Sequence, residues 1–137
     1  MPQIIDKPAL IDALGVVGFL ILMGLVLAAM VSAQRRAAHV SLGDGGDAVL
    51  LRRIRAHGNF TEVAPFVMIG LIGLAMSGSS GITVLVLGGL FILARIAHAV
   101  GLYGSDGRSP GRLIGVLVSW VVLAVIGVKL LALLLLA

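Results

Sequence analysis

The chain of 137 residues contains no cysteine, and only 12% of its residues are charged and 4% aromatic. The absence of cysteine excludes a small secreted domain held together by disulfides. The low charged fraction argues against a soluble domain or a disordered tail, because soluble chains carry about 25% charged residues. Hydrophobic residues instead reach 60%, and the mean hydropathy is +1.19. A chain this short cannot bury such an apolar load in one core, so the rest must face lipid.

Positive charge is in slight excess, but it does not indicate a nucleic-acid partner. Ten Lys and Arg residues against six Asp and Glu residues leave a net charge of only +4. In a membrane protein such an excess is typical of loops on the cytoplasmic side. We therefore expect membrane lipid around the chain and no nucleic acid bound to it.

Four apolar stretches cover about residues 10–33, 59–76, 82–103 and 113–137. Each is long enough for a membrane helix, which needs roughly 20 residues. The first stretch is longer than the core of a signal peptide and follows Asp6-Lys7 rather than a basic segment, so we expect a permanent anchor. With no internal repeat, the sequence predicts an all-α membrane protein, a single four-transmembrane-helix bundle over residues 1–137.

Arginine is distributed unevenly between the connections. An even number of spans places the first connection, Arg35–His57 with its turn signal Gly43–Gly46, on the same side as the third, Gly104–Arg112. Together these two connections hold seven arginines, whereas the opposite side holds Lys7 and Lys129. This bias predicts that the arginine-rich connections are cytoplasmic and that both termini lie outside the cytoplasm.

A polar stripe enters the second span. At 100° per residue, Arg52, Arg55, Asn59 and Glu62 fall within about 80° of one another on a helix. An ionised side chain in the hydrocarbon costs about 2.5–3.5 kcal/mol even on a mild scale. Glu62 therefore needs a partner, a water-filled cavity or a proton.

The third span offers a partner for Glu62. Arg95 and His98 lie three residues apart on one helix face, and Arg95 is about 12 Å along the axis from Tyr103, too deep to reach the interface easily. We expect Glu62 and Arg95 to meet in the interior. In the alternative reading, Arg52 is a topology anchor, and the histidines are interfacial or packing residues.

The residue types indicate the kind of ligand. Without cysteine, a His-x-x-x-His pattern or paired carboxylates, the sequence predicts no metal site. A cationic rim with one deeper carboxylate suits an anionic ligand that has an amino group. A small peptide with two carboxylates and one amine fits this set of groups, and the side chains alone do not specify which peptide.

The segment between Arg52 and Pro65 has the pattern R-x-x-R-A-H-x-N-x-x-E-x-x-P. It resembles the signature of the MAPEG family, the membrane-associated proteins of eicosanoid and glutathione metabolism. The segments 40–47 and 94–101 resemble the bacterial branch, which implies a bacterial inner membrane. The resemblance covers nearly the whole chain. It implies a homotrimer that binds glutathione between subunits near the cytoplasmic face and uses it on a lipophilic small-molecule substrate.

The resemblance assigns roles residue by residue. Residues between the end of the first span and the start of the second would contact or adjoin glutathione: Arg36, Arg52, Arg55, His57, Asn59 and Glu62. Arg95 and His98 match a pair on the third helix of the family. Arg112 resembles the arginine thought to stabilise the glutathione thiolate, and Arg108 is a rival for that role because the preceding loop varies in length.

Several positions depart from the family pattern. Val63 stands where a tyrosine commonly follows the glutamate, and Gly58 replaces a side chain that is basic in some members. Leu102 occupies a tyrosine position one turn after His98. Tyr103 is one residue late, which rotates it by about 100°, so we do not expect it to substitute. These departures weaken catalysis more than they weaken glutathione binding.

Three classes of function are compatible with the sequence. The first is a glutathione-dependent membrane enzyme of transferase or peroxidase type. The second is a non-catalytic family member that binds glutathione or another small anion, or serves only as a trimeric membrane component. The third is a small four-span exporter. Such exporters usually depend on a glutamate in the first span, where this chain has only Asp12.

The charge bias makes a prediction about topology. A reporter that is active only outside the cytoplasm should be active when it is fused to the C-terminus and inactive when it is inserted between Gly104 and Arg112. Activity of a cytoplasm-only reporter at the C-terminus would contradict the predicted orientation.

Overall fold

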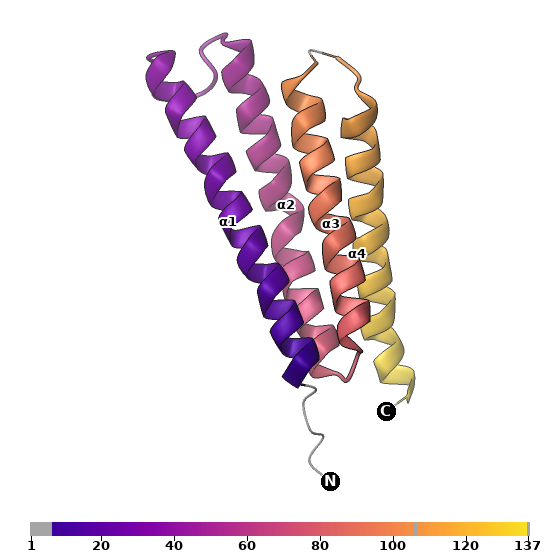
Figure 1. Ribbon diagram of the computed structural model, residues 1–137. Helices are drawn as coiled ribbons and strands as arrows, with labels where there is room; N and C mark the ends of the chain where they lie inside the picture. Colours follow the sequence, from indigo (N-terminus) through magenta and orange to yellow (C-terminus); the bar gives the residue numbers. More distant parts are fainter. Residues whose placement is uncertain (1–6, 106, 137) are drawn as a thin grey trace.

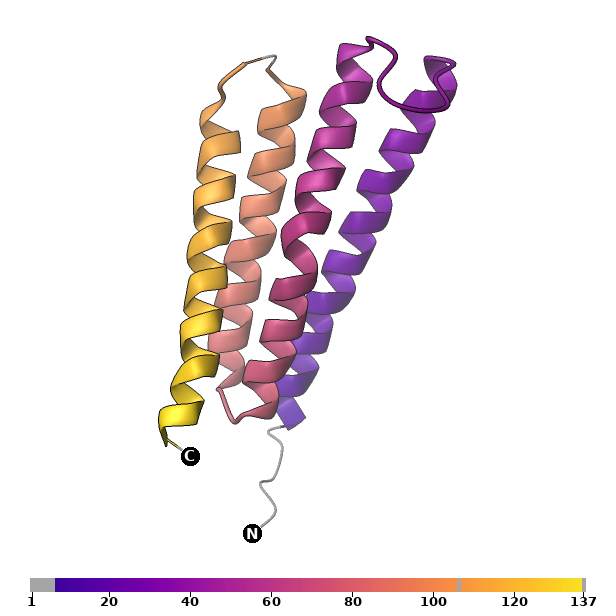
Figure 2. The same ribbon diagram turned by 180° about the vertical axis from the view of Figure 1, so that it is seen from behind.

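The structure is a computed structural model that describes residues 7–105 and 107–136, and over these residues it contains four α-helices and no strand. They are α1 (Lys7–Ala37), α2 (Ala48–Met76), α3 (Gly81–Tyr103) and α4 (Pro110–Leu136). The helices run up and down side by side (Figure 1; Figure 2). Each is long and apolar enough to cross a membrane, which confirms the predicted all-α architecture. Residues 1–6 and 137, which belong to the predicted domain and last span, lie outside the described residues.

The first connection is shorter than predicted. The helix α1 continues to Ala37, and α2 begins at Ala48 rather than near residue 59, so the connection covers 38–47 instead of Arg35–His57. Asp47 caps α2, because its Oδ1 accepts a hydrogen bond of 2.8 Å from the Leu50 amide. That bond, and a second from the Gln34 side chain, hold the pKa of the Asp47 carboxyl below its ordinary value. All four residues of the polar stripe therefore lie within α2.

The connection 38–47 and the connection between α3 and α4 lie at one end of the bundle, and the described chain starts and stops at the other end (Figure 1). Gly43, Gly45 and Gly46 adopt positive φ in the first connection, as the turn signal predicts. Arg35 Nη1 donates a hydrogen bond of 2.7 Å to the Gly43 carbonyl, which ties this connection to α1. The pairing of the connections agrees with the prediction, and the side of the membrane that they face stays a prediction.

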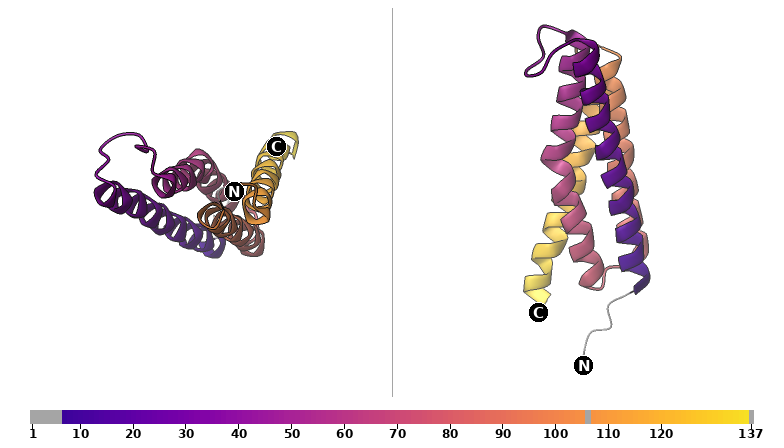
Figure 3. Two further views of the ribbon diagram at one scale, coloured as in Figure 1. Left: turned by 90° about the horizontal axis from the view of Figure 1, so that it is seen from above. Right: turned by 90° about the vertical axis from the view of Figure 1, so that its left-hand side faces the viewer.

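The helices α2 and α3 form the centre of the bundle, and α1 and α4 flank them without contacting each other over the described residues (Figure 3). In the most apolar stretches of α2 and α3, 39% and 44% of the residues are buried, against 17% in each of α1 and α4. The outer helices thus have most of their surface exposed in the single chain. Pro65 lies inside α2 and has no N–H, so the Thr61 carbonyl lacks its usual helical donor.

Two glycines let α3 and α4 touch through their backbones. A Cβ atom on Gly115 would lie 2.5 Å from the Ala94 carbonyl oxygen and 2.7 Å from His98 Cβ, and one on Gly111 would lie 2.9 Å from the Ala97 carbonyl oxygen. These distances are too short for any side chain. The contact fixes the first turns of α4 against α3, which is where the polar residues of the bundle gather.

The glycine contact predicts a sharp difference between two substitutions on α4. Gly115→Ala should destabilise the protein by about 1–3 kcal/mol, because the added methyl group forces the α3 and α4 backbones apart. Gly127→Ala is the matched control, since a Cβ there meets no atom within 4 Å, and its stability should be equal to or above that of the wild type. Thermal unfolding in detergent measures both. Equal melting temperatures for the two variants would contradict the contact.

Candidate functional site

A cavity of about 200 Å³ lies between α2, α3 and α4 near the arginine-rich end of the bundle. It contains five of the residues that the sequence selects: Arg55, Asn59, Glu62, His98 and Arg112. The rest of its lining consists of small or apolar residues: Ile54, Gly58, Leu102 and Val116. Pockets that enclose a drug-sized ligand have volumes of roughly 300–1,000 Å³. This cavity is therefore smaller than those that enclose a ligand of that size.

Besides Arg95, four of the predicted site residues do not line this cavity, judged over the described part of the chain. Arg36 is exposed at the end of α1, a helix that does not contact α4. Arg52 is half-buried on the stripe face of α2, one turn before Arg55 and outside the cavity lining, and His57 is half-buried on another face. Arg108 lies in the connection before α4 and lines a separate pocket.

Arg95 is the most deeply buried charged residue described, at 2% exposure, and it lies behind the cavity rather than in its wall. Its Nη1 donates a hydrogen bond of 2.6 Å to Asn59 Oδ1, and its Nη2 donates one of 2.7 Å to the Gly115 carbonyl. The guanidinium carbon also lies 5.6 Å from the centre of the Phe91 ring, within reach of a cation–π contact. Its position links α2, α3 and α4 through one side chain.

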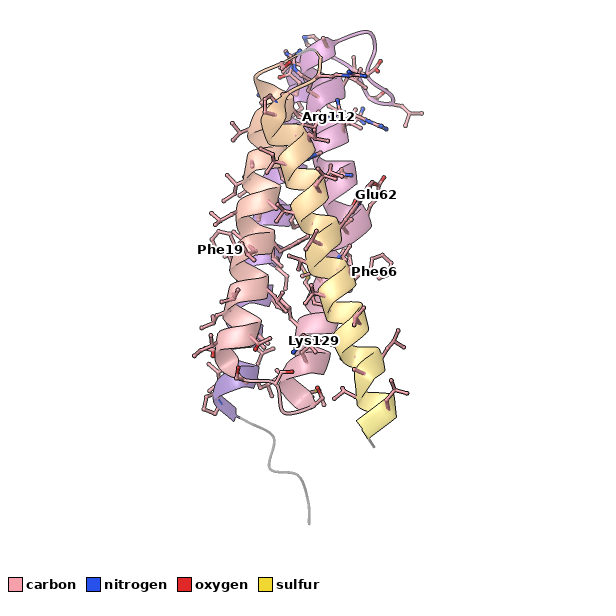
Figure 4. All side chains as sticks on the ribbon, turned by 90° about the vertical axis from the view of Figure 1, so that its right-hand side faces the viewer. Phe19, Glu62, Phe66, Arg112 and Lys129 are labelled. Atoms are coloured by element: carbon pink, nitrogen blue, oxygen red, sulfur yellow. The ribbon has the colours of Figure 1, made fainter. Side chains whose placement is uncertain are left out.

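The predicted direct contact between Glu62 and Arg95 is wrong, because Asn59 lies between the two side chains. Arg95 occupies the amide oxygen of Asn59, and the Asn59 nitrogen donates a long hydrogen bond of 3.4 Å to Glu62 Oε2. Glu62 is exposed and points away from the bundle, on the same side as Phe66 (Figure 4). The sequence established the depth of these residues but not the rotation of each side chain.

The Asn59 amide has a defined orientation as a result. Its oxygen is used by Arg95, so the group offers only N–H donors to the cavity and to Glu62. The guanidinium groups of Arg55 and Arg112 form no hydrogen bond with the described residues, and both line the cavity. Three donor groups, on Arg55, Asn59 and Arg112, thus line the cavity together with one carboxylate. This arrangement favours a ligand with more hydrogen-bond acceptors than donors.

His98 and Leu102 form the α3 wall of the cavity. The His98 ring lies against the start of α4, with Nδ1 at 3.2 Å from the Arg112 carbonyl oxygen. Tyr103 faces elsewhere, since its hydroxyl donates to Met30 Sδ of α1 at 3.7 Å. Tyr103 therefore lies outside the cavity lining, and the expectation that it does not replace the missing tyrosine stays a prediction.

A second, larger pocket of about 820 Å³ lies beside the first turn of α4. Pro110, Leu113 and Val116 give it an apolar wall, and Arg108 and Ser109 stand at its edge. Arg112 and Val116 line both pockets, whereas Arg108 lines only the second. Arg112 thus occupies the boundary between a polar cavity and an apolar one.

Sequence reasoning missed the contribution of α4 to the site apart from Arg112. The Gly115 carbonyl accepts hydrogen bonds from both Arg95 and Ser119, so it completes the buried network. A signal was present, since Gly111-x-x-x-Gly115 is the small-residue spacing that brings membrane helices close together. Its partner residues on α3 could not be identified without coordinates.

These features define an integral membrane protein whose helices enclose a cationic site with one carboxylate at one end of the bundle. The chain belongs to the MAPEG family, because the model of that family matches residues 13–132, most of its length. No curated protein and no solved structure matches it. Membership supports a membrane protein related to glutathione or eicosanoid metabolism.

The Arg95–Asn59 bond predicts non-additive effects on stability. Asn59→Ala removes one of the two acceptors of the Arg95 guanidinium, so the double variant with Arg95→Met should lose less free energy of unfolding than the sum of the single variants. The expected coupling is about 1–3 kcal/mol. A cycle of Arg95→Met with Glu62→Gln is the control and should give a smaller coupling, because these two side chains do not touch. Additive losses in the Asn59 cycle would contradict the network.

Proposed function

We propose that the protein is a glutathione-dependent membrane enzyme of transferase or peroxidase type, acting on lipophilic electrophiles or hydroperoxides. The observation that carries this proposal is the position of Arg112, which lines both the polar cavity and the apolar pocket. A thiol peptide held in the first and a lipid-soluble substrate held in the second would meet at this side chain. Membership of the MAPEG family supports the choice of glutathione.

The cavity has the groups that such a peptide needs. Glutathione has two carboxylates and one ammonium group, so it presents mainly acceptors to a protein. Arg55 offers paired donors for a carboxylate, and the Asn59 amide offers further N–H groups. Glu62 accepts only one long hydrogen bond among the described residues, which leaves its carboxylate available for the ammonium group.

Arg112 is the residue that we assign to activation of the thiol. A thiol becomes a strong nucleophile only as the thiolate, and a nearby guanidinium favours that form through charge and hydrogen bonding. Arg112 is preferred over Arg108 because only Arg112 reaches the polar cavity. The apolar wall formed by Pro110, Leu113 and Val116 would receive the electrophile from the bilayer and place it beside the thiolate.

A neighbouring copy of the chain would complete the site. Glu62 is exposed within a membrane span, and Phe66 and Ile69, at 67% and 70% exposure, continue the same region of α2. A carboxylate in this position is costly against lipid, so the face requires a cover. We propose the homotrimer typical of the family, in a bacterial inner membrane, with Arg36 reaching the ligand of an adjacent protomer.

One observation favours a second candidate, a family member that binds glutathione without catalysis. Leu102 is buried in the cavity wall where active relatives are expected to have a tyrosine, and the Tyr103 hydroxyl is committed to Met30. The site then lacks a phenol. No such observation favours the exporter.

The proposal predicts that glutathione stabilises the detergent-purified protein in a concentration-dependent way. Arg55→Gln should weaken binding by about 10- to 100-fold, because it removes a charge-assisted contact worth about 1.5–3 kcal/mol. A thermal-shift titration measures both effects. Lys129→Gln makes the same change in net charge at the other end of the bundle and should bind as the wild type does.

The two candidates differ in turnover. An enzyme conjugates a model electrophile, and Arg112→Gln abolishes most of that activity, whereas a non-catalytic protein binds glutathione and shows no turnover. Absence of any stabilisation by glutathione at saturating concentration would contradict both.

A further inference from the structure

The Nε2 atom of His98 has no role in the proposed function. This side chain is 4% exposed and lines the cavity. Its Nδ1 lies 3.2 Å from the Arg112 carbonyl oxygen. Because a carbonyl oxygen only accepts hydrogen bonds, Nδ1 must carry the proton, and Nε2 of the neutral ring keeps its lone pair.

The lone pair of Nε2 is open to the cavity. The atom forms no hydrogen bond with the residues that the structure describes. Among the described residues that are not exposed, one side-chain nitrogen or oxygen is inaccessible to solvent and also lacks a hydrogen bond. That atom is Arg95 Nε. His98 Nε2 is therefore reachable, and the space that reaches it is the cavity whose wall the ring forms.

We propose that His98 is the base that removes the thiol proton of the bound peptide, a proposal that rests on the function argued above. His98 forms an Nε2–H bond as the S–H bond breaks, and the electron pair of that bond remains on sulfur. The Nδ1–H bond to the Arg112 carbonyl is retained throughout. The imidazolium then passes its proton to water at the mouth of the cavity, and no further reactant is needed.

The charges around His98 allow the ring to accept a proton briefly but not to retain it. Arg95 lies on its own helix, Arg112 on α4 and Arg55 on α2, and all three disfavour an imidazolium. Glu62 is the one carboxylate of the cavity. Proton transfer to the ring is therefore a brief step before the proton is released to water.

Glu62 is the other group of the cavity that can take a proton, and His98 is the better candidate. Glu62 is exposed and already accepts a hydrogen bond from Asn59, and its charge is needed to pair with the ammonium group. His98 is buried and is held in one tautomer by the backbone of Arg112, the residue that we assign to the thiolate. One residue of α4 thereby orients the base and stabilises its product.

The test separates the rate of thiolate formation from its extent. After rapid mixing with glutathione, the ultraviolet absorbance of the thiolate and the proton released to an indicator dye are followed in wild type and His98→Gln. Glutamine preserves a donor for the Arg112 carbonyl but cannot accept a proton. The rate should fall by about 100-fold, as is typical for loss of a general base, while affinity and the final thiolate fraction stay close to wild type. Added imidazole should restore the rate.

Two further variants define the outcomes. Arg112→Gln should lower the final thiolate fraction, and the exposed loop variant His39→Asn should behave as the wild type does. A wild-type rate in His98→Gln would overturn the role of His98. Failure of the wild-type protein to bind glutathione would instead contradict the proposed function, so the two failures are distinguishable.

A measurement on the wild-type protein covers the case in which His98→Gln does not fold. Nitrogen chemical shifts of labelled histidine report which ring nitrogen carries the proton. The proposal requires the neutral Nδ1–H tautomer in the unliganded protein. Observation of the Nε2–H tautomer would overturn it, because Nε2 would then have no lone pair.

Discussion

The buried guanidinium of Arg95 is the constraint on which the polar end of this bundle depends. A charge removed from water costs several kcal/mol unless it is surrounded by acceptors. Arg95 finds them on two other helices, in the Asn59 amide and the Gly115 carbonyl, with the Phe91 ring alongside. These bonds bring α2, α3 and α4 together at one level, and the cavity opens just beside them. The position of the candidate site thus follows from satisfying one cation.

The architecture was largely predictable, because membrane spans depend on local composition. Long apolar stretches, the turn glycines at Gly43–Gly46 and the arginine bias located four helices and grouped the connections correctly. The start of α2 was misjudged because residues 48–58 are too polar to read as a membrane span, although Asp47 caps a regular helix there. Hydropathy measures where lipid begins, and helices extend beyond it.

The sequence predicted which residues of α2 line the cavity but not which hydrogen bonds they form. The repeat of polar residues on α2 selected Arg55, Asn59 and Glu62, and all three line the cavity. Which of them Arg95 contacts depends on rotation about the helix axis and on side-chain length, so Asn59 rather than Glu62 was found as its partner. The Gly115 carbonyl was invisible for a simpler reason: every residue has a carbonyl, and only the close approach of α4 makes this one available.

Pro65 has a consequence for the other half of α2. The proline interrupts the helical hydrogen bonding one turn below Glu62, and the freed Thr61 carbonyl is the acceptor left over. Below that point α2 packs against α4 through Gly70, and above it α2 carries the polar stripe. The loss of one backbone hydrogen bond at this level lowers the resistance of the helix to bending. The segment of α2 that carries Asn59 and Glu62 is therefore joined to the lower segment by one hydrogen bond fewer than in a regular helix.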